Sequence, residues 1–186
     1  WVKLTVDAAA NGADAGHRIV LRHAEVLDAD GNFYTENLRA ATQRVEYLLV
    51  GDEARTEFEP HFTFQGFRYV AIEGYPGDLT LDDLTGVVIH SDMTDTGEFE
   101  TSDTRLNQLQ HNIRWGQKGN FLDVPTDCPQ RDERMGWTGD AQAFCRTATF
   151  NMQVAPFFTK WLGDLAADQY ANGSIPFVIP DVLTNG

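Results

Sequence analysis

Cysteine is the scarcest of the chemically informative residues in this sequence. The 186 residues include only Cys128 and Cys145, which form no CxxC pair and have no histidine at the spacing of a zinc ligand, so we expect no zinc site. Carboxylates surround Cys128 in the sequence and would disfavour its thiolate, so we expect no nucleophile there. Cys145 falls on the apolar face of an expected helix and is predicted to lie in the core.

Positive charge is scarce as well. The chain has 14 basic residues against 28 acidic ones, and its formal net charge is −14. This balance excludes nucleic acid and anionic membranes as partners, whereas neutral sugars are compatible with it. No apolar run approaches the length of a membrane-spanning helix. The first residues lack the pattern of a signal peptide, but this absence carries no weight because Trp1 is not an initiator methionine.

Short β-type segments separated by turns dominate the first half of the chain. The expected strands cover residues 18–27, 42–50, 57–64, 67–74 and 84–91, with turns at residues 28–32 and at Gly51 and Asp52. Five or so strands of this kind predict an antiparallel β-sandwich over residues 1–97. These strands are too few to close both sheets, so we expect the sandwich to be incomplete.

Helical spacing begins after residue 101. Ser102 is the expected N-cap of a helix whose apolar face carries Leu106, Leu109 and Ile113. Its expected polar face consists of His111, Arg114, Gln117 and Lys118.

Two more helices are predicted further along the chain. One covers residues 138–151 and has Asp140 in its first turn, where the helix dipole favours a carboxylate. The other starts at Pro156 and stops near residues 172–173. The tail over residues 174–180 reads as extended and apolar, with nothing to pack on within the chain. A β-rich half followed by a helix-rich half indicates two domains rather than one interleaved α/β sheet.

The segment DVPTDCPQRDERMGWTGD, residues 123–140, concentrates the reactive side chains of the chain. It holds five carboxylates, two guanidinium groups and one indole: Asp123, Asp127, Asp132, Glu133, Asp140, Arg131, Arg134 and Trp137. One interpretation is a solvated acidic loop with structural ion pairs. A second is divalent metal binding, which we rank lower because EF-hand spacing and a histidine-rich set are absent. A third is glycoside hydrolysis, which uses two carboxylates and benefits from an apolar wall beside the proton donor.

Residues 123–144, DVPTDCPQRDERMGWTGDAQAF, resemble the signature segment of the bacterial α-L-rhamnosidases of glycoside hydrolase family 78. Residues 61–77, 101–120 and 159–182 resemble the same proteins in the same order. The resemblance implies an inverting hydrolase that releases terminal α-L-rhamnose from glycosides or polysaccharides. It implies no cofactor and no metal. The expected partners are a rhamnose-containing carbohydrate and the remainder of the parent polypeptide.

The fold implied by the resemblance is multidomain, β then α. An antiparallel β-sandwich portion (1–97) precedes a linker helix and the first helices of an (α/α)6 catalytic barrel (98–186).

The resemblance also assigns roles to residues. Glu133 falls where the family has its general acid, Asp127 and Asp140 match positions that hold the rhamnose hydroxyls, Arg131 matches a substrate-contacting arginine, and Trp137 matches an aromatic residue of the sugar pocket. The base of this family lies on a later barrel helix, beyond residue 186, and cannot be named here. We expect Asp132 to have a structural or charge-tuning role, Asp123 to order the loop, and Arg134 to pair with a carboxylate of the loop.

Two alternatives remain open at this point. The chain could be part of a non-catalytic carbohydrate-binding or assembly module that kept the fold and lost the chemistry. The presence of Glu133, Arg131 and Trp137 in one short segment counts against this. It could also belong to a related exo-glycosidase with another sugar specificity, because hydroxyl recognition depends on the geometry of the pocket.

Overall fold

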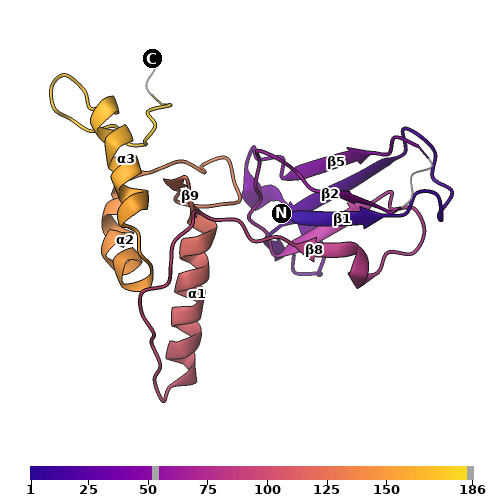
Figure 1. Cartoon of the computed structure of the whole chain (residues 1–186), viewed down its shortest axis with the longest axis horizontal. Coiled ribbons are helices and arrows are strands. Elements are labelled where there is room, and N and C mark those ends of the chain that lie inside the picture. Colours follow the sequence, from indigo (N-terminus) through magenta and orange to yellow (C-terminus); the bar gives the residue numbers. More distant parts are fainter. Residues whose placement is uncertain (52–54, 184–186) are drawn as a thin grey trace. The chain divides into compact units, whose positions relative to one another are not determined.

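The computed structural model describes residues 1–51 and 55–183, which form two compact units (Figure 1). The first unit consists of Trp1–Val88 together with Gln130–Asp132, and the second of Ile89–Pro129 together with Glu133–Gly186. Each unit has hydrophobic clusters of its own. Within the described part of the chain, no helix has the length and apolar character needed to cross a membrane.

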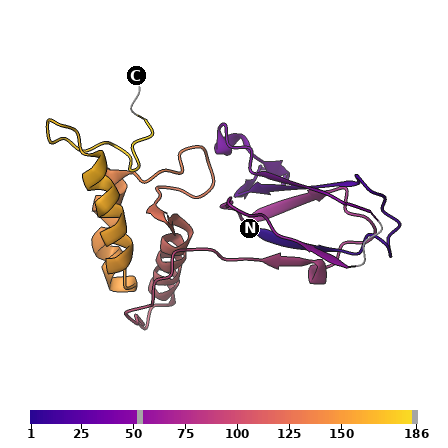
Figure 2. The same ribbon diagram turned by 45° about the horizontal axis from the view of Figure 1, so that its top comes forward.

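Antiparallel strands build the first unit (Figure 2). The β6-β1-β8 and β5-β2-β7 sheets have three strands each, and β3 and β4 form a separate pair. The strands are β1 (Val2–Val6), β2 (Arg18–Ala24), β3 (Val26–Leu27), β4 (Phe33–Tyr34), β5 (Arg44–Leu48), β6 (Thr56–Phe58), β7 (Tyr69–Glu73) and β8 (Leu84–Gly86), and two short 3-10 helices are η1 (Glu36–Leu38) and η2 (Leu81–Asp83).

The core of the first unit lies between its two sheets. Leu4 and Val6 of β1 cluster with Ile19 and Leu21 of β2, and all four side chains are buried. On the neighbouring strand β7, Ile72 lies opposite Leu21 and packs against the same cluster. Alternating residues of each sheet therefore point into a shared apolar layer, which is the arrangement of a β-sandwich.

The structure has a strand in each of the predicted ranges, but the bounds of the strands differ from the predicted ones. The expected strand over residues 18–27 is divided at Glu25 into β2 and β3. The one over residues 57–64 ends at Phe58, shortly before Pro60, which has no N–H group to donate to a ladder. The one over residues 84–91 ends at Gly86. Strand β1 was missed, although Val2, Leu4 and Val6 alternate with polar residues. Of the turn predicted at residues 51–52, residue 52 lies outside the described residues.

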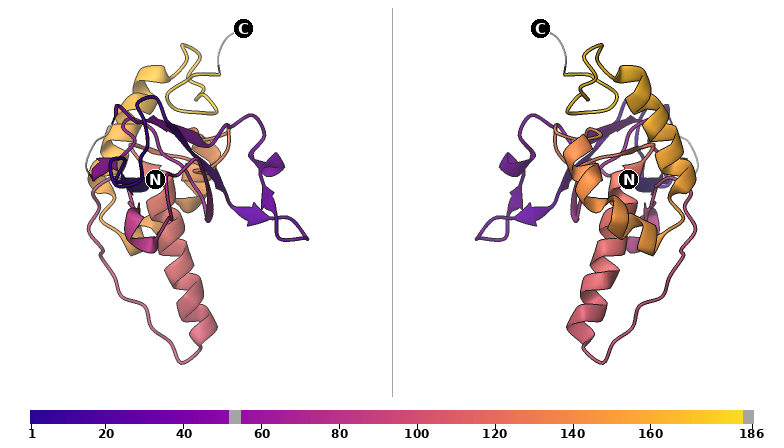
Figure 3. Two further views of the ribbon diagram at one scale, coloured as in Figure 1. Left: turned by 90° about the vertical axis from the view of Figure 1, so that its right-hand side faces the viewer. Right: turned by 90° about the vertical axis from the view of Figure 1, so that its left-hand side faces the viewer.

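Three helices and one small hairpin build the second unit as far as it is described, to residue 183. They are α1 (Thr104–Asn120), β9 (Phe121–Leu122), β10 (Val124–Pro125), α2 (Thr138–Asn151) and α3 (Ala155–Asp168). Helices α2 and α3, orange to yellow-orange in Figure 3, pack through one cluster that centres on Phe121. The rings of Phe121 and Phe157 stack with their centroids 4.6 Å apart, and Phe144 and Phe158 approach Phe121 edge-on.

The face that α1 buries is not the predicted one. Leu106 and Leu109 are exposed, whereas Gln117, which was placed on the polar face, is 1% exposed. The Gln117 amide donates to the Ala148 carbonyl at 3.3 Å and accepts from the Asn151 amide at 3.0 Å. A buried amide is tolerated when both of its ends are paired, and α2 supplies both partners. The N-cap prediction is also wrong by one residue: Asp103, not Ser102, accepts a hydrogen bond from the Arg105 amide.

The tail prediction is wrong as well. Helix α3 ends at Asp168, a few residues before the predicted stop, and the chain then turns back. Val178 and Ile179 are fully buried, and Ile179 packs with Ala141 and Trp161. The tail therefore has a packing surface within this chain, because α2 and α3 leave an apolar groove that its side chains fill.

His23 is a buried titratable group in the first unit. Its ring meets Phe67 edge-on with centroids 4.9 Å apart, and Nδ1 donates to the Gln43 carbonyl at 3.0 Å. Because a carbonyl only accepts, Nδ1 carries the hydrogen, and Nε2 has no hydrogen-bond partner among the described residues. Burial lowers the pKa of His23 below its ordinary value, and the hydrogen bond to Gln43 opposes this lowering more weakly.

We predict that acidification destabilises the first unit through His23. In the unfolded chain a histidine takes up its proton below about pH 6.5, whereas the folded protein, with its lower pKa, resists this uptake. The contribution to stability is therefore fully present above that pH and is lost as the pH falls through the folded pKa. Urea unfolding at a series of pH values measures the loss. The variant His23→Asn keeps a donor for the same carbonyl and should flatten the dependence, and His61→Asn, at an exposed position, should keep it. An unchanged slope in His23→Asn would contradict the prediction.

Candidate functional site

The acidic loop begins at the β9–β10 hairpin, whose turn residue is Asp123. Asp123 has a left-handed backbone (φ 66°), which Asp tolerates better than most residues. Its amide donates to the Ser91 hydroxyl at 2.9 Å, and its carboxylate accepts from Lys160 at 3.2 Å. The hydrogen bond to Asp164, supported by the one to Asp123, raises the pKa of the Lys160 ammonium. These contacts fit the loop-ordering role expected for Asp123.

Asp127 and Met135 close the next part of the loop. The Asp127 amide donates to the Met135 carbonyl at 3.3 Å, and the Met135 amide donates back to the Asp127 carboxylate at 3.4 Å. Inside this closure, ligand atoms of Asp127, Cys128 and Glu133 lie within 4.8 Å of one another. The loop therefore brings two of the predicted carboxylates close together.

Trp137 connects this closure to helix α2. Its indole N–H donates to the Glu133 carbonyl at 3.3 Å, and its backbone amide donates to the Met135 carbonyl at 2.9 Å. Trp137 is also the N-cap residue of α2, where its side chain cannot pair the free amides of the first turn. The tail supplies a partner instead, because the Thr138 amide donates to the Phe177 carbonyl at 2.9 Å.

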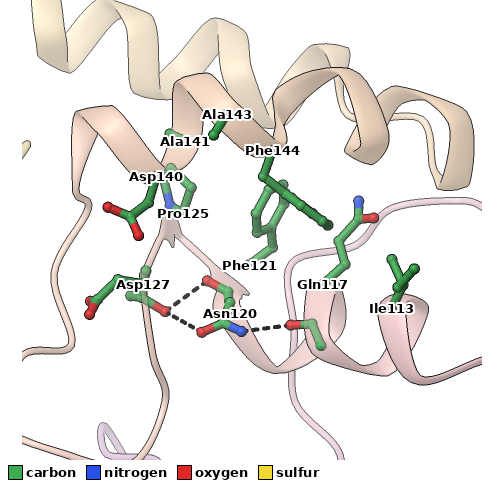
Figure 4. Close-up of a pocket in the computed structure, with 12 residues that line it drawn as sticks. Ile113, Gln117, Asn120, Phe121, Pro125, Asp127, Asp140, Ala141, Ala143 and Phe144 are labelled. Atoms are coloured by element: carbon green, nitrogen blue, oxygen red, sulfur yellow. Dashed lines mark hydrogen bonds between the residues drawn. The ribbon is translucent and has the colours of Figure 1, made fainter. Parts of the chain in front are cut away.

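A cavity of about 360 Å³ lies between α1, the hairpin and α2 (Figure 4). Asp127 from the loop and Asp140 from the first turn of α2 both line it. Figure 4 shows these two carboxylates at one end and Ile113 at the other, with Phe144 between them. Two acceptor groups on an otherwise largely apolar wall can hold the hydroxyl groups of a neutral ligand. Glu133 and Trp137 are not among the residues that line this cavity.

Three further polar residues of the cavity wall, Gln117, Asn120 and Thr126, were missed by the sequence prediction. Thr126 is buried, and its hydroxyl contacts the Asn120 carbonyl at 3.0 Å. The Asn120 amide in turn donates to the Gly116 carbonyl at 2.8 Å, in the last turn of α1. A lone Thr and a lone Asn carry no spacing signal, so only the fold could reveal them.

Arg131 and Asp132 belong by their contacts to the first unit, within the segment Gln130–Asp132. Arg131 is half-buried, and Asp132 accepts a hydrogen bond from the Ala40 amide at 3.2 Å. The Asp132 contact fits the structural role expected for that residue. The second unit therefore brings together Asp127, Glu133, Trp137 and Asp140, whereas Arg131 is held by the first.

Cys145 differs from its predicted place. Cys145 is half-buried rather than part of the core, and its thiol lies 3.3 Å from the Gln142 carbonyl one turn earlier in α2. Cys128 is the buried cysteine. With Asp127 and Glu133 it could offer three ligand atoms to a cation, but clusters of this kind are common in acidic loops that bind no metal.

Family models match nearly the whole chain in two parts. The model described as the bacterial alpha-L-rhamnosidase concanavalin-like domain matches residues 1–90. The model described as the bacterial alpha-L-rhamnosidase 6 hairpin glycosidase domain matches residues 94–186. The β-sandwich and the three helices thus correspond to consecutive domains of one kind of protein.

Individual relatives agree with these matches. An alpha-L-rhamnosidase of Formosa agariphila is 50% identical over 173 residues, which cover 92% of this chain and 19% of the relative. An alpha-L-rhamnosidase of Streptomyces avermitilis is 51% identical over 175 residues, which cover 93% of this chain and 17% of the relative. The crystal structure of a Streptomyces avermitilis alpha-L-rhamnosidase complexed with L-rhamnose superposes with a TM-score of 0.90 at 48% identity, covering 100% of this chain and 17% of that one. The chain therefore spans less than a fifth of the length of these proteins.

The loop is also held by a close approach at Gly136. The Ile179 amide donates to the Gly136 carbonyl at 2.9 Å, and a Cβ atom on Gly136 would overlap the Ile179 carbonyl oxygen. It would also lie 3.1 Å from Nε1 of Trp161, which itself donates to that oxygen. Only glycine fits this position without movement of the tail.

We predict that Gly136→Ala destabilises the second unit by about 1–3 kcal/mol, the usual effect of forcing an extra methyl group into a packed site. Gly139→Ala is the matched control, because open space surrounds that glycine in the first turn of α2. Alanine has the higher helix propensity, so the control should be neutral or gain up to about 1 kcal/mol. Urea unfolding of both variants measures the difference, and equal stabilities would contradict the prediction.

Proposed function

The chain belongs to the bacterial alpha-L-rhamnosidase family, and from this premise we propose that it is the acid-bearing part of a longer inverting glycoside hydrolase. The proposed substrate is a glycoside or polysaccharide with a terminal α-L-rhamnose. The observation that carries the proposal is the closed loop in which Glu133 lies beside Asp127, within 4.8 Å, next to the Trp137 indole.

Glu133 is the proposed general acid. It protonates the glycosidic oxygen as the bond to the anomeric carbon breaks, while water attacks the opposite face of the sugar ring and loses a proton to a base. Two hydrogen bonds restrain the backbone near Glu133. The Glu133 carbonyl accepts from the Trp137 indole, and the amide of Met135, two residues later, donates to the Asp127 carboxylate. A proton donor is effective only when its position is held in this way.

The proposed substrate-binding residues are Asp127, Asp140, Arg131 and Trp137. Support for the two aspartates comes from the cavity that both line, where their carboxylates can accept hydrogen bonds from sugar hydroxyls. Trp137 offers an apolar ring beside Glu133, and aromatic rings of this kind stack on sugar faces.

The catalytic base is proposed to lie outside these 186 residues. Inverting enzymes keep acid and base roughly 6.5–9.5 Å apart, so that a water molecule fits between them. Asp127 is too close to Glu133 for this arrangement. Asp132 already accepts from the Ala40 amide, and its contacts belong to the first unit. The base therefore has to come from the part of the protein that completes the barrel.

The domain division is also a proposal. We place the boundary at residues 97–98, between a β-sandwich domain and the linker helix that opens the barrel. The family matches meet between residues 90 and 94, and the contact units divide after Val88, which supports a boundary in this neighbourhood.

In the longer protein, Glu133→Gln should lower turnover of alkyl α-L-rhamnosides by about 10²–10⁴-fold, the usual contribution of a general acid. The loss should be much smaller for dinitrophenyl α-L-rhamnoside, whose leaving group departs without a proton. Steady-state kinetics with both substrates measure the two effects. The control Asp123→Asn removes a charge of the same loop at an exposed position but keeps a side-chain oxygen that can accept from Lys160, so both rates should stay near wild type. Equal losses on the two substrates would contradict the assignment of the acid.

The 186 residues alone should bind rhamnose weakly at most and should not hydrolyse alkyl α-L-rhamnosides, because the base is absent from them. Calorimetry and product analysis measure the two properties. Turnover that depends on Glu133 would contradict the distant base. If such turnover released rhamnose with retained configuration, observed by NMR of the first product anomer, Asp127 would be reassigned as a nucleophile. Rhamnose binding by the longer protein without hydrolysis would instead support the non-catalytic module.

A further inference from the structure

The segment Gln130–Asp132 is the one part of the acidic loop that groups with the first unit. It carries Arg131 and is bonded directly to Glu133. Whatever holds this segment therefore limits where the backbone of Glu133 can lie, without touching the substrate.

Two hydrogen bonds hold the two ends of the segment. The Gln43 side-chain amide donates to the Gln130 carbonyl, and both of these residues are buried. The Ala40 amide donates to the Asp132 carboxylate at 3.2 Å. Loss of the first contact would cost more free energy than loss of the second. The Gln130 carbonyl is buried, so without the Gln43 amide it would have neither that partner nor water.

Gln43 is itself fixed by the central strand of a sheet. Its carbonyl accepts from the His23 amide at 2.9 Å and from His23 Nδ1 at 3.0 Å. Strand β2, which ends just after His23, pairs with β5 on one side and with β7 on the other. The backbone of Gln43 has a left-handed conformation (φ 46°), which costs energy for a residue other than glycine and persists only when its surroundings impose it. The side chain therefore projects from a rigid base.

We propose that Gln43, in the β-sandwich, is a positioning residue for the general acid: by holding the Gln130 peptide it sets the placement of the segment that leads into Glu133. The proposal rests on the proposed function. Gln43 acts through the backbone and makes no contact with the substrate. Displacements of about 1 Å at a catalytic group can cost on the order of 100-fold in rate, so one lost backbone contact is enough to be measured.

The test uses the longer protein and the variant Gln43→Met, which keeps the length and burial of the side chain but has no N–H group. Turnover of an alkyl α-L-rhamnoside, which needs the acid, should fall by about tenfold or more, within the range that misplacement produces. Turnover of dinitrophenyl α-L-rhamnoside does not need the acid and should fall less, since only the accompanying displacement of Arg131 lowers it. A general loss of folded protein would lower both rates by the same factor, so the ratio of the two rates separates positioning from stability.

Leu21→Ala is the matched control. Leu21 is buried in the same sandwich and belongs to its core cluster, so the substitution destabilises the first unit without removing a contact to residues 130–132. The ratio of the two rates should stay at the wild-type value. A wild-type ratio in Gln43→Met as well would overturn the proposal.

A second measurement keeps the two proposals apart. Hydrogen–deuterium exchange of the 186-residue chain reports on the backbone of residues 130–134 whether or not the protein is active. Exchange there should be faster in Gln43→Met than in Leu21→Ala, after both are compared at equal global stability. Faster exchange in a protein that lacks rhamnosidase activity would support the tether and refute the proposed function. Equal exchange in the two variants would overturn the tether itself.

Discussion

The irregular loop between β10 and α2 depends on one constraint: its backbone N–H and C=O groups must find partners where no regular ladder supplies them. Met135 pairs with Asp127 across the loop, and the tail pairs with Gly136 and Thr138 through the backbone at residues 177–179. Every carboxylate proposed for the site is carried by, or lies next to, a segment held in this way. The tail is therefore part of the structure of the loop, although it lies far from it in the sequence.

The same constraint bears on the chemistry proposed for the loop. A sugar-cleaving site needs its acid and its binding carboxylates held in a fixed geometry, which long loops provide only when surrounding elements support them. Here the second unit closes the loop around Glu133 through Asp127 and Trp137. The first unit holds the three residues before Glu133 through Gln43 and Ala40. These contacts of the first unit are the basis of the positioning role proposed for Gln43.

Much of the fold could be predicted from local pattern, and the failures have a common cause. The runs of β-type residues in β2 and β7 and the helical spacing of α2 were sufficient to place these elements, because each signal lies within a few consecutive residues. Gln117 and the tail were misplaced for the opposite reason. A glutamine is buried only if another helix presents partners for its amide, as the neighbourhood of Ala148 and Asn151 does. An apolar tail packs only if a groove exists, as Trp161 and Ala141 provide. Neither condition is visible within a window of sequence.

For the site, the sequence alone determined which chemistry is available. The residue types in the acidic loop, and their likeness to one family of glycosidases, are the basis on which we propose carboxylate-based sugar cleavage with Glu133, Asp127 and Asp140 among its groups. Only the tertiary structure decided how these groups are held: Asp127 lies beside Glu133, Asp140 and Asp127 line one cavity, and the Gln130 carbonyl accepts from the side-chain amide of Gln43. The reason is physical. Residue identity sets charge and hydrogen-bonding capacity, whereas distance and burial arise only when segments remote in the chain pack together.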